Sequence, residues 1–413
     1  MTTDEKAVDV AKYIRQMGER AREAAAALAR LSTEAKNAAL AAIADALEAR
    51  RGEISAANAS DVARAKDVGI TPAMLDRLTL TDARFDAMVA GLRHVASLPD
   101  PVGETIWTRK RPSGINIRKV RVPFGVVAVV FESRPNVFID TAALCLKTGN
   151  AVILRGGKEA IETNKALSCA VCAALVGTGA EGAVQLVDIL DHAAVTELVR
   201  AVGLVDVAIP RGGERLIRAM CEAALVPVLK HYKGVCHIYV DETADFDMAL
   251  RILDNAKTQR PGVCNAAECL LVNAKVADAF LPRVETWAKE KGVTLHFASK
   301  ESVDWEREFL ALELNVGVVA DCAEAVAHIN RYGSHHSDCI VTADAAKAAA
   351  FLRDVDSAAV YHNVSTRFTD GAEFGMGAEI GISTDKLHAR GPMGLEELTT
   401  YKYQITGEGI TRA

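Results

Sequence analysis

The sequence lacks the features of a membrane, secreted or nucleic-acid-binding protein. No apolar run approaches the ~18 uninterrupted residues of a spanning helix. The first residues, "MTTDEKAVDVAKYIRQ", contain acidic side chains and no apolar core, so they do not resemble a signal peptide. The formal net charge of -6 argues against a dedicated binder of nucleic acids or anionic membranes, although it allows a local basic pocket for a small acidic ligand.

The sequence also offers no disulfide framework. It contains nine cysteines, an odd number, and most of them lie inside apolar patterns, which favours reduced thiols in a cytoplasmic protein. Cys169 and Cys172 form a CxxC pair in the middle of a predicted helix, where we expect core residues rather than a redox or zinc site. His335 and His336 have no third ligand at a useful spacing and are predicted to lie in a loop.

A chain of 413 residues predicts two or three domains. Residues 3–98 have helical periodicity, with Ser32 as a helix cap followed by Glu34, and with a capping-box spacing from Thr79 to Asp82. The next segment, "TIWTRKRPSGINIRKVRVPFG", is basic and predicts an extended hairpin that turns at residues 112–114.

From Gly125 onward, short apolar runs alternate with helical segments, in two successive blocks. Uninterrupted apolar strands that alternate with helices predict parallel sheets covered on both faces, and therefore an α/β fold. Ligands of such sheets bind outside the carboxyl ends of the strands. Since no low-complexity linker separates the two blocks, we expect them to pack against each other.

The stretch "KTQRPGVCNAAECLLV" contains two cysteines in different settings. Cys264 follows a run of backbone breakers near Arg260, where a substrate can reach a thiol and a positive charge can favour the thiolate. Buried, inert cysteines are the common alternative. Cys269 opens an apolar strand and is predicted to pack in the core.

Three turns carry polar groups suited to anions. "VILRGGKEA" and "IPRGGERL" each join a strand to a helix through a glycine pair, and the backbone amides of such a turn suit a phosphate. The alternative is a solvated turn. "FESRPNV" places Glu132, Ser133, Arg134 and Asn136 after a strand, where a carboxamide can stabilise an oxyanion or the segment can simply be a polar loop with a helix cap.

Taken together, these motifs resemble the aldehyde dehydrogenase superfamily over nearly the whole chain, and within it the reductases of L-glutamyl 5-phosphate. The resemblance rests on "VPFGVVAVVFESRPNV", "KTGNAVILRGGKEA", "IPRGGERL", "HYKGVCHIYVD", "QRPGVCNAAECLLV" and "EFGMGAEIGISTDKLHARGPMGLEELTTYKY". It implies two Rossmann-like α/β domains with parallel sheets and a β-hairpin oligomerisation arm.

The resemblance also implies roles for individual residues. Cys264 matches the nucleophile, and Asn136 matches the carboxamide of the oxyanion hole. Matching cofactor-binding positions are Arg155, Gly156, Gly157, Lys158, Gly212, Gly213 and Glu313, the last beside the nicotinamide ribose. Candidate substrate-binding residues are Glu132, Ser133, Arg134, Lys233 and Arg367.

Two departures from the superfamily pattern refine this expectation. Many NAD-dependent members have "KPSE" where this chain has "RGGK", and Lys158 suits a 2′-phosphate, which favours NADP(H). Hydrolytic members have a water-activating glutamate where this chain has Lys230 and His231. The missing base favours acyl-phosphate reduction, from L-glutamyl 5-phosphate to L-glutamate 5-semialdehyde in proline biosynthesis, over aldehyde oxidation. The alternatives are a phosphate-independent aldehyde dehydrogenase and a catalytically silent cofactor-binding scaffold.

The resemblance gives the expected domain limits and partners. Residues 1–104 and 122–231 are expected to form the NADP(H)-binding domain, residues 232–388 the catalytic domain, and residues 105–121 and 389–413 the arm. An unpaired strand edge on such an arm predicts a homo-oligomer. Substrate channelling from glutamate 5-kinase is possible. No metal, nucleic acid or membrane is expected to bind.

Overall fold

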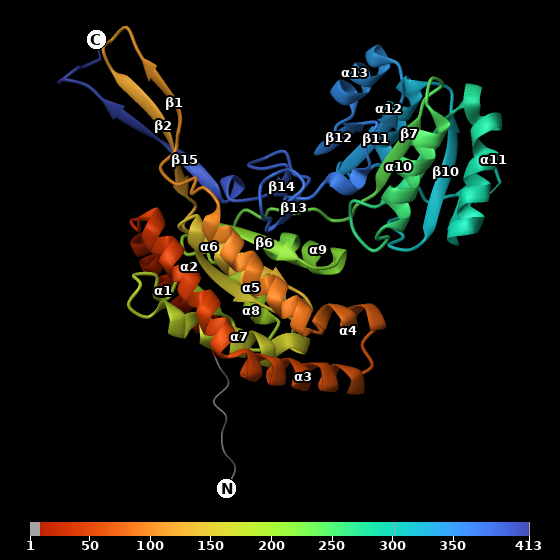
Figure 1. The fold of residues 1–413 in the computed structure, drawn as a ribbon. Coiled ribbons are helices and arrows are strands. Elements are labelled where there is room, and N and C mark those ends of the chain that lie inside the picture. The colour runs from red at the N-terminus through yellow and green to blue at the C-terminus, as the bar shows by residue number, and fades with distance from the viewer. Residues whose placement is uncertain (1–8, 301, 413) are drawn as a thin grey trace. The chain divides into compact units, whose positions relative to one another are not determined.

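The computed structural model describes residues 9–300 and 302–412 (Figure 1). The predicted first domain and the predicted arm also include residues 1–8 and 413, which lie outside the described residues. The described residues form two units: residues 9–229, 376–381 and 393–412 make the first, and residues 230–300, 302–375 and 382–392 make the second. Among the described residues, no helix is both long and apolar enough to cross a bilayer.

The first unit begins with a layer of helices: α1 (Val10–Leu28), α2 (Thr33–Ala49), α3 (Arg51–Asp67), α4 (Pro72–Leu78) and α5 (Asp82–Ser97). The predicted cap of α2 is confirmed, because the Ser32 hydroxyl accepts from the Ala35 N–H at 3.2 Å. The predicted capping box is wrong: Thr81 caps α5, whereas the Thr79 hydroxyl donates to the Leu75 carbonyl at the end of α4.

A four-stranded parallel sheet forms the centre of the first unit, in the order β5-β4-β3-β6. Its strands and helices are β3 (Val126–Phe131), α6 (Pro135–Lys147), β4 (Ala151–Arg155), η1 (Lys158–Ala160), α7 (Ile161–Leu175), β5 (Val184–Leu186), α8 (Ala193–Arg200), β6 (Val207–Arg211) and α9 (Glu214–Ala223). Every residue of β3 is buried, as its uninterrupted apolar sequence predicts. The chain order reverses between β3 and β6, so a crevice for ligands is expected at their carboxyl ends.

The predicted hairpin is confirmed as β1 (Thr105–Lys110) and β2 (Asn116–Pro123), which are antiparallel and turn at Gly114 with a φ of 94°. The C-terminal strand β15 (Thr399–Thr406), which follows η3 (Glu396–Leu398), pairs with the other edge of β2. We call this three-stranded sheet the arm (Figure 1). It joins residues 105–123 to a strand close to the C-terminus.

The second unit contains a six-stranded sheet in the order β12-β11-β7-β8-β10-β9, and all its strands are parallel. Its elements are β7 (Cys236–Val240), α10 (Phe246–Thr258), β8 (Ala267–Asn273), α11 (Ala274–Lys291), β9 (Thr294–Phe297), β10 (Glu313–Val319), α12 (Cys322–Tyr332), β11 (Ser337–Val341), α13 (Ala345–Asp354), β12 (Ala359–His362) and η2 (Thr366–Phe368). Separate apolar clusters centred on Leu270 and Ile340 include residues of this sheet and of its helices. Two short strands, β13 (Gly381–Ser383) and β14 (Gly391–Met393), also pair with each other.

Candidate active site

The predicted nucleophile lies at the amino edge of the second sheet. Cys264 belongs to the loop between α10 and β8, and the segments that lead into β7, β10 and β11 end at the same edge because the strands are parallel. This placement differs from the common ligand site of open α/β sheets, which is the carboxyl edge.

Close packing fixes the backbone around Cys264. A side chain on Gly234 would collide with the Cys264 carbonyl, and the Cys236 thiol donates to that same carbonyl at 3.2 Å. The next residue, Asn265, is buried and donates to the Thr369 carbonyl at 2.9 Å, while its own carbonyl accepts from the Thr366 hydroxyl at 2.8 Å. The loop is therefore held from two sides, and the Cys264 side chain remains partly exposed.

Arg367 is the predicted substrate-binding residue that the structure brings to this loop. Its guanidinium donates to the Asn265 side chain and, at 2.9 Å, to Gln259. Burial lowers the pKa of Arg367, which stays far above neutrality for a guanidinium. Arg367 and Gln259 also line a cavity of about 690 Å³ between α10 and the segment after β12, a size that suits a small ligand.

A buried ion pair joins the two elements on either side of the Cys264 loop. Lys257 near the end of α10 lies 2.7 Å from Glu268 in β8, and both side chains are 0% exposed. Burial raises the pKa of Glu268 to about 7 against the opposing effect of the Lys257 ammonium. An unpaired charge is costly in the interior, so Lys257 and Glu268 stay together. The pair therefore holds α10 and β8 at a fixed distance, which the Cys264 loop spans.

The other cysteines divide between core and surface. Cys269 is fully buried in β8, as predicted. The prediction that Cys169 and Cys172 are core residues is wrong, because both are exposed on α7. Their helix has apolar residues on more than one face, and Arg50 donates to the Cys169 sulfur at 3.1 Å. The predicted mid-helix position of the pair is confirmed.

Two histidines lie beside the predicted nucleophile. His231, His336 and Cys264 each offer a ligand atom, and these three atoms lie within 4.8 Å of one another. The prediction that His335 and His336 lie in a loop is confirmed. The prediction that they lack a further ligand is wrong for His336, because His231 and Cys264 come close to it from distant parts of the chain. Burial lowers the pKa of His336 to about 3, so its imidazole is neutral near pH 7.

The segment where hydrolytic enzymes have their base contains no carboxylate, and the nearby carboxylates are engaged. Lys230 holds both oxygens of Asp385 at 3.0 Å. Lys233, a predicted substrate-binding residue, donates to the Glu306 carbonyl at 2.6 Å. The segment therefore offers no carboxylate as a general base for water.

Glu313, predicted to contact the nicotinamide ribose, begins β10 and lies 3.0 Å from His296. Glu308, which the sequence interpretation overlooked, accepts from the Gly234 N–H at 2.8 Å, and Gly234 packs against Cys264. Because Glu308 contacts Gly234 and Gly234 contacts Cys264, Glu308 is a second candidate, besides Glu313, for a role near the thiol. Its place among polar residues of an irregular segment gave no signal in the sequence.

In the first unit, two predicted turns meet at the carboxyl ends of β3 and β6. Glu132 follows β3, and its carboxylate accepts from the Gly213 N–H at 2.9 Å, at the start of α9. A side chain on Gly212 would collide with Glu132. Glu132 is therefore part of the glycine turn itself, and a phosphate at this helix start would compete with its carboxylate.

Asn136 lies in the first turn of α6 with its side chain exposed. Its amide nitrogen donates to Asp140 at 2.9 Å, one helical turn further on. This contact orients the carboxamide and leaves its second N–H available for a developing oxyanion. Burial raises the pKa of Asp140 to about 6, although the contact with Asn136 lowers it.

The turn after β4 fits an anionic cofactor. Arg155 is buried and, among the described residues, its Nε atom has no hydrogen-bond partner. Gly156 packs against Asn164, where no side chain fits, and Lys158 is exposed at the start of η1. A phosphate bound here would meet backbone amides and two cations, which is the donor set that such a cofactor needs.

The remaining substrate-binding candidates of this region have structural contacts. Ser133 is 3% exposed, and both its N–H and its hydroxyl donate to Glu159, at 2.8 and 2.6 Å. Ser133 is thus better described as an anchor between the turns after β3 and β4. Arg134, partly buried, occupies the N-cap position of α6.

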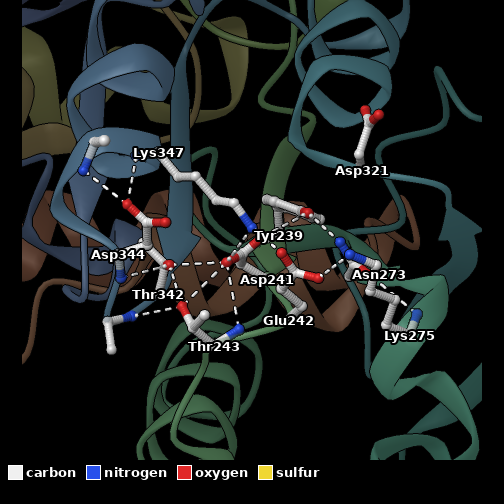
Figure 2. A network of polar contacts seen from close by, with 12 residues as sticks. Tyr239, Asp241, Glu242, Thr243, Asn273, Lys275, Asp321, Thr342, Asp344 and Lys347 are labelled. Atoms are coloured by element: carbon white, nitrogen blue, oxygen red, sulfur yellow. Dashed lines mark hydrogen bonds and ion pairs between the residues drawn. The ribbon is translucent and has the colours of Figure 1, made fainter.

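The carboxyl edge of the second sheet is filled by a polar network (Figure 2). The buried Asp241 accepts from Thr342 at 2.9 Å and from Lys347 at 3.2 Å. Tyr239 donates to Asp241 and accepts from Asn273, each at 3.1 Å. Since an ammonium already neutralises this carboxylate, the network ties β7 to its neighbours and offers no evident ligand site.

The chain belongs to the aldehyde dehydrogenase family, whose family model matches residues 4–305. Its most similar relatives include gamma-glutamyl phosphate reductases. The protein of that name from Moorella thermoacetica is 54% identical over 98% of this chain and 100% of its own length. That from Thermobifida fusca is 52% identical over the same shares of the two chains.

Solved structures support the same relationship. The gamma-glutamyl phosphate reductase of Thermotoga maritima superposes with a TM-score of 0.95 at 43% identity, covering 97% of this chain and 100% of its own. An acetylating aldehyde dehydrogenase from Geobacillus thermoglucosidasius shares the fold at 15% identity, with a TM-score of 0.69 and 98% coverage of each chain. The predicted aldehyde dehydrogenase-like α/β fold is therefore confirmed.

Proposed function

We propose that this chain reduces L-glutamyl 5-phosphate to L-glutamate 5-semialdehyde, with NADPH as the reductant and inorganic phosphate as the second product. The observation that carries the proposal is the loop of Cys264, which presents a partly exposed thiol on a fixed backbone beside Arg367. The names of the full-length relatives support the same reaction.

In the proposed reaction, the Cys264 thiolate attacks the acyl carbon, and the bond between that carbon and the phosphate oxygen breaks to release phosphate. The carboxamide of Asn136, oriented by Asp140, donates to the oxyanion. NADPH, when bound, supplies a hydride that reduces the resulting thioester. The hemithioacetal then loses its carbon–sulfur bond, which frees the aldehyde and restores the thiolate.

The chain's own residues protect the thioester from water. The segment from Lys230 to Lys233 contains no carboxylate, and the ammonium of Lys230 engages Asp385. Without a carboxylate base in this segment, attack by water is slower, which leaves time for hydride transfer or for attack by phosphate in the reverse reaction. This reasoning favours acyl-phosphate reduction over oxidation to a free acid.

For the cofactor, we propose that Arg155, Gly156, Gly157 and Lys158 hold phosphate groups, with Lys158 beside a 2′-phosphate. Gly212 and Gly213 form the second turn of the same crevice, and Glu313 or Glu308 contacts the ribose of the nicotinamide. The buried Arg155, with an unpartnered Nε among the described residues, supports an anionic ligand. Arg367 is the proposed partner of a substrate anion; Arg134, Lys233 and Glu132 are weaker candidates.

We further propose that the enzyme acts in the cytoplasm as a homo-oligomer, and that it can receive its unstable substrate from glutamate 5-kinase. An acyl phosphate hydrolyses readily, so transfer close to its source would limit loss. The nine cysteines, all free in the structure, agree with a reducing compartment.

The reverse reaction tests the proposal. Purified protein is mixed with L-glutamate 5-semialdehyde and NADP⁺, with and without inorganic phosphate, and NADPH absorbance is followed. We expect reduction of NADP⁺ that requires phosphate and disappears in Cys264→Ser. Equal rates without phosphate would identify an aldehyde dehydrogenase that forms the free acid, and unchanged cofactor binding without any turnover would identify a scaffold.

A further inference from the structure

Three side chains from distant parts of the sequence converge on the amino edge of the second sheet. His231 precedes β7, Cys264 precedes β8 and His336 precedes β11. Their ligand atoms lie within 4.8 Å of one another, and the two imidazole rings meet edge to face with centroids 5.6 Å apart. The reductase mechanism proposed above assigns no role to either histidine.

Each ring is held by an oxygen atom at its Nδ1 position. Nδ1 of His231 donates a hydrogen bond to the Ile382 carbonyl at 2.8 Å. Nδ1 of His336 lies 2.9 Å from the Ser337 hydroxyl, which in turn contacts Thr369 at 2.5 Å. Histidines that bind metals are typically anchored in this way, because a partner at one ring nitrogen fixes the tautomer and directs the other nitrogen at the ion.

His336 provides an independent sign of a ligand site. Its side chain is 0% exposed, and within the described residues its Nε2 atom has no hydrogen-bond partner. A buried polar atom without a partner is rare in native proteins and calls for an explanation such as an ion.

We propose that His231, Cys264 and His336 form a binding site for a thiophilic divalent cation, represented by Zn²⁺. Two imidazoles and a thiolate are ligands that zinc prefers, and a water molecule or a substrate oxygen completes a tetrahedron. Zinc–nitrogen and zinc–sulfur bonds of ~2.0–2.3 Å place tetrahedral ligands roughly 3.3–3.8 Å apart, so the three atoms, which lie within 4.8 Å of one another, have to move slightly closer together on binding. His231 and Cys264 are partly exposed and give the ion access.

Occupancy of this site switches the enzyme off reversibly. Coordination draws electron density from the thiolate sulfur and holds it against the cation, so we expect the metal-bound thiolate to attack an acyl carbon far more slowly. The inhibition rests on the proposed role of Cys264 as nucleophile, whereas binding of the ion does not.

Binding is measured on the full chain, reduced with a phosphine and freed of metal. All variants carry Cys169→Ser and Cys172→Ser, which remove the exposed thiol pair. Calorimetry with Zn²⁺ is expected to give one ion per chain, and Co²⁺ to give the near-ultraviolet charge-transfer absorption of a thiolate ligand. We expect Cys264→Ser to abolish that absorption, and His231→Ala and His336→Gln each to weaken binding at least about tenfold.

His335→Ala is the matched control, because His335 is the neighbouring histidine and contacts the Asp356 carbonyl instead. It is expected to bind Zn²⁺ like the parent. His231→Ala keeps the test decisive if His336→Gln fails to fold. Parent-like binding in both histidine variants, or an absorption that survives Cys264→Ser, would overturn the site.

Activity separates the two proposals. Zinc is expected to inhibit the phosphate-dependent reaction at the concentrations at which it binds, and a chelator to restore the rate. Tight binding without inhibition would contradict the role of Cys264 as nucleophile. Normal turnover with no binding of either metal would contradict the metal site alone.

Discussion

Asn136, the proposed oxyanion donor, is hydrogen-bonded to Asp140, whose ionisation changes with pH. Asp140 accepts from the Asn136 amide at 2.9 Å, and burial raises its pKa to about 6. Above that pH the carboxylate accepts one N–H of the carboxamide and directs the other outward. Below it, the protonated carboxyl loses part of this hold.

We therefore expect the reductase rate to fall as the pH drops below about 6, and the fall to be flattened in Asp140→Asn. Asn136→Ala is expected to reduce kcat ~10²–10³-fold at every pH, as for other lost oxyanion donors.

The stability of the fold has the opposite pH dependence. Because the pKa of Asp140 is raised, this residue contributes fully to the free energy of unfolding below its ordinary pKa of 3.8 and loses that contribution as the pH rises through about 6. The pH dependence of the rate and the thermal unfolding of both variants check these expectations. A rate that falls below about pH 6 as steeply in Asp140→Asn as in the parent would contradict the proposed role of Asp140.

Lys158 is exposed at the turn after β4, where its ammonium is available to a 2′-phosphate. We expect Lys158→Glu to raise KM for NADPH at least about tenfold and to leave KM for NADH unchanged or lower, since one charge pair at such a site is worth roughly 1.5–3 kcal/mol. Lys165→Glu is the control, because Lys165 lies on α7 and pairs with Glu162. Equal effects on both cofactors would contradict the assignment.

At the scale of secondary structure, the Lys257–Glu268 pair joins α10 to β8 on either side of the Cys264 loop. We expect Glu268→Gln to lower the free energy of unfolding by ~3–5 kcal/mol, because it leaves Lys257 as an uncompensated buried charge. Replacing both partners, as Lys257→Met with Glu268→Leu, is expected to recover most of that loss. Chemical denaturation measures the free energy of unfolding of the single and the double variant. A Glu268→Gln variant as stable as the parent would contradict the argument.

The arm carries a row of aromatic and cationic side chains across its three strands. Trp107, Lys119 and Tyr403 face one another in register, and the Trp107 and Tyr403 rings lie 5.8 Å apart. The Lys119 ammonium lies 3.5 Å from the centre of the Tyr401 ring. These cross-strand contacts stabilise a sheet that has little core of its own.

The sequence predicted elements whose signal is local. The buried strand β3, the Ser32 cap and the turn of the arm follow from periodicity or turn chemistry, and all three are present. The cap of α5 was misplaced because Thr79 and Thr81 are both plausible caps, and only the end of α4 decides between them.

Features that depend on distant segments were not predictable. His336 meets Cys264 only because β7, β8 and β11 are adjacent in the sheet, an order that periodicity does not reveal. The contact of Glu308 with Gly234 likewise joins the segments before β10 and β7. The nucleophile loop itself was predictable, because glycine, proline and a polar residue surround Cys264 in the sequence.

At the scale of the whole molecule, the arm ends in a strand whose outer edge has no partner among the described residues of this chain. Its β15 strand exposes Tyr401, Tyr403 and Ile405 at alternate positions. Such an edge is normally covered by another chain. A second copy of this protein is the partner proposed above.

We expect Ile405→Lys, at a side chain that is 61% exposed, to shift the protein toward monomers in sedimentation velocity. Val202→Lys is the matched control, since Val202 is 66% exposed in the first unit outside the arm. It is expected to leave the assembly unchanged. If both variants sediment like the parent, or the parent is itself a compact monomer, the arm does not mediate assembly.

The pairing of β15 with β2 also bears on how the protein is made. At ~5–20 residues per second, the ribosome finishes β15 roughly 15–60 s after β2. During that time the hairpin of β1 and β2 exists without its third strand, and one edge of β2 is open to other nascent chains. Arg118, Lys119 and Arg121 lie along this strand. We expect the repulsion between these side chains in different copies to disfavour pairing at the unfinished edge until the last residues of the chain arrive to close it.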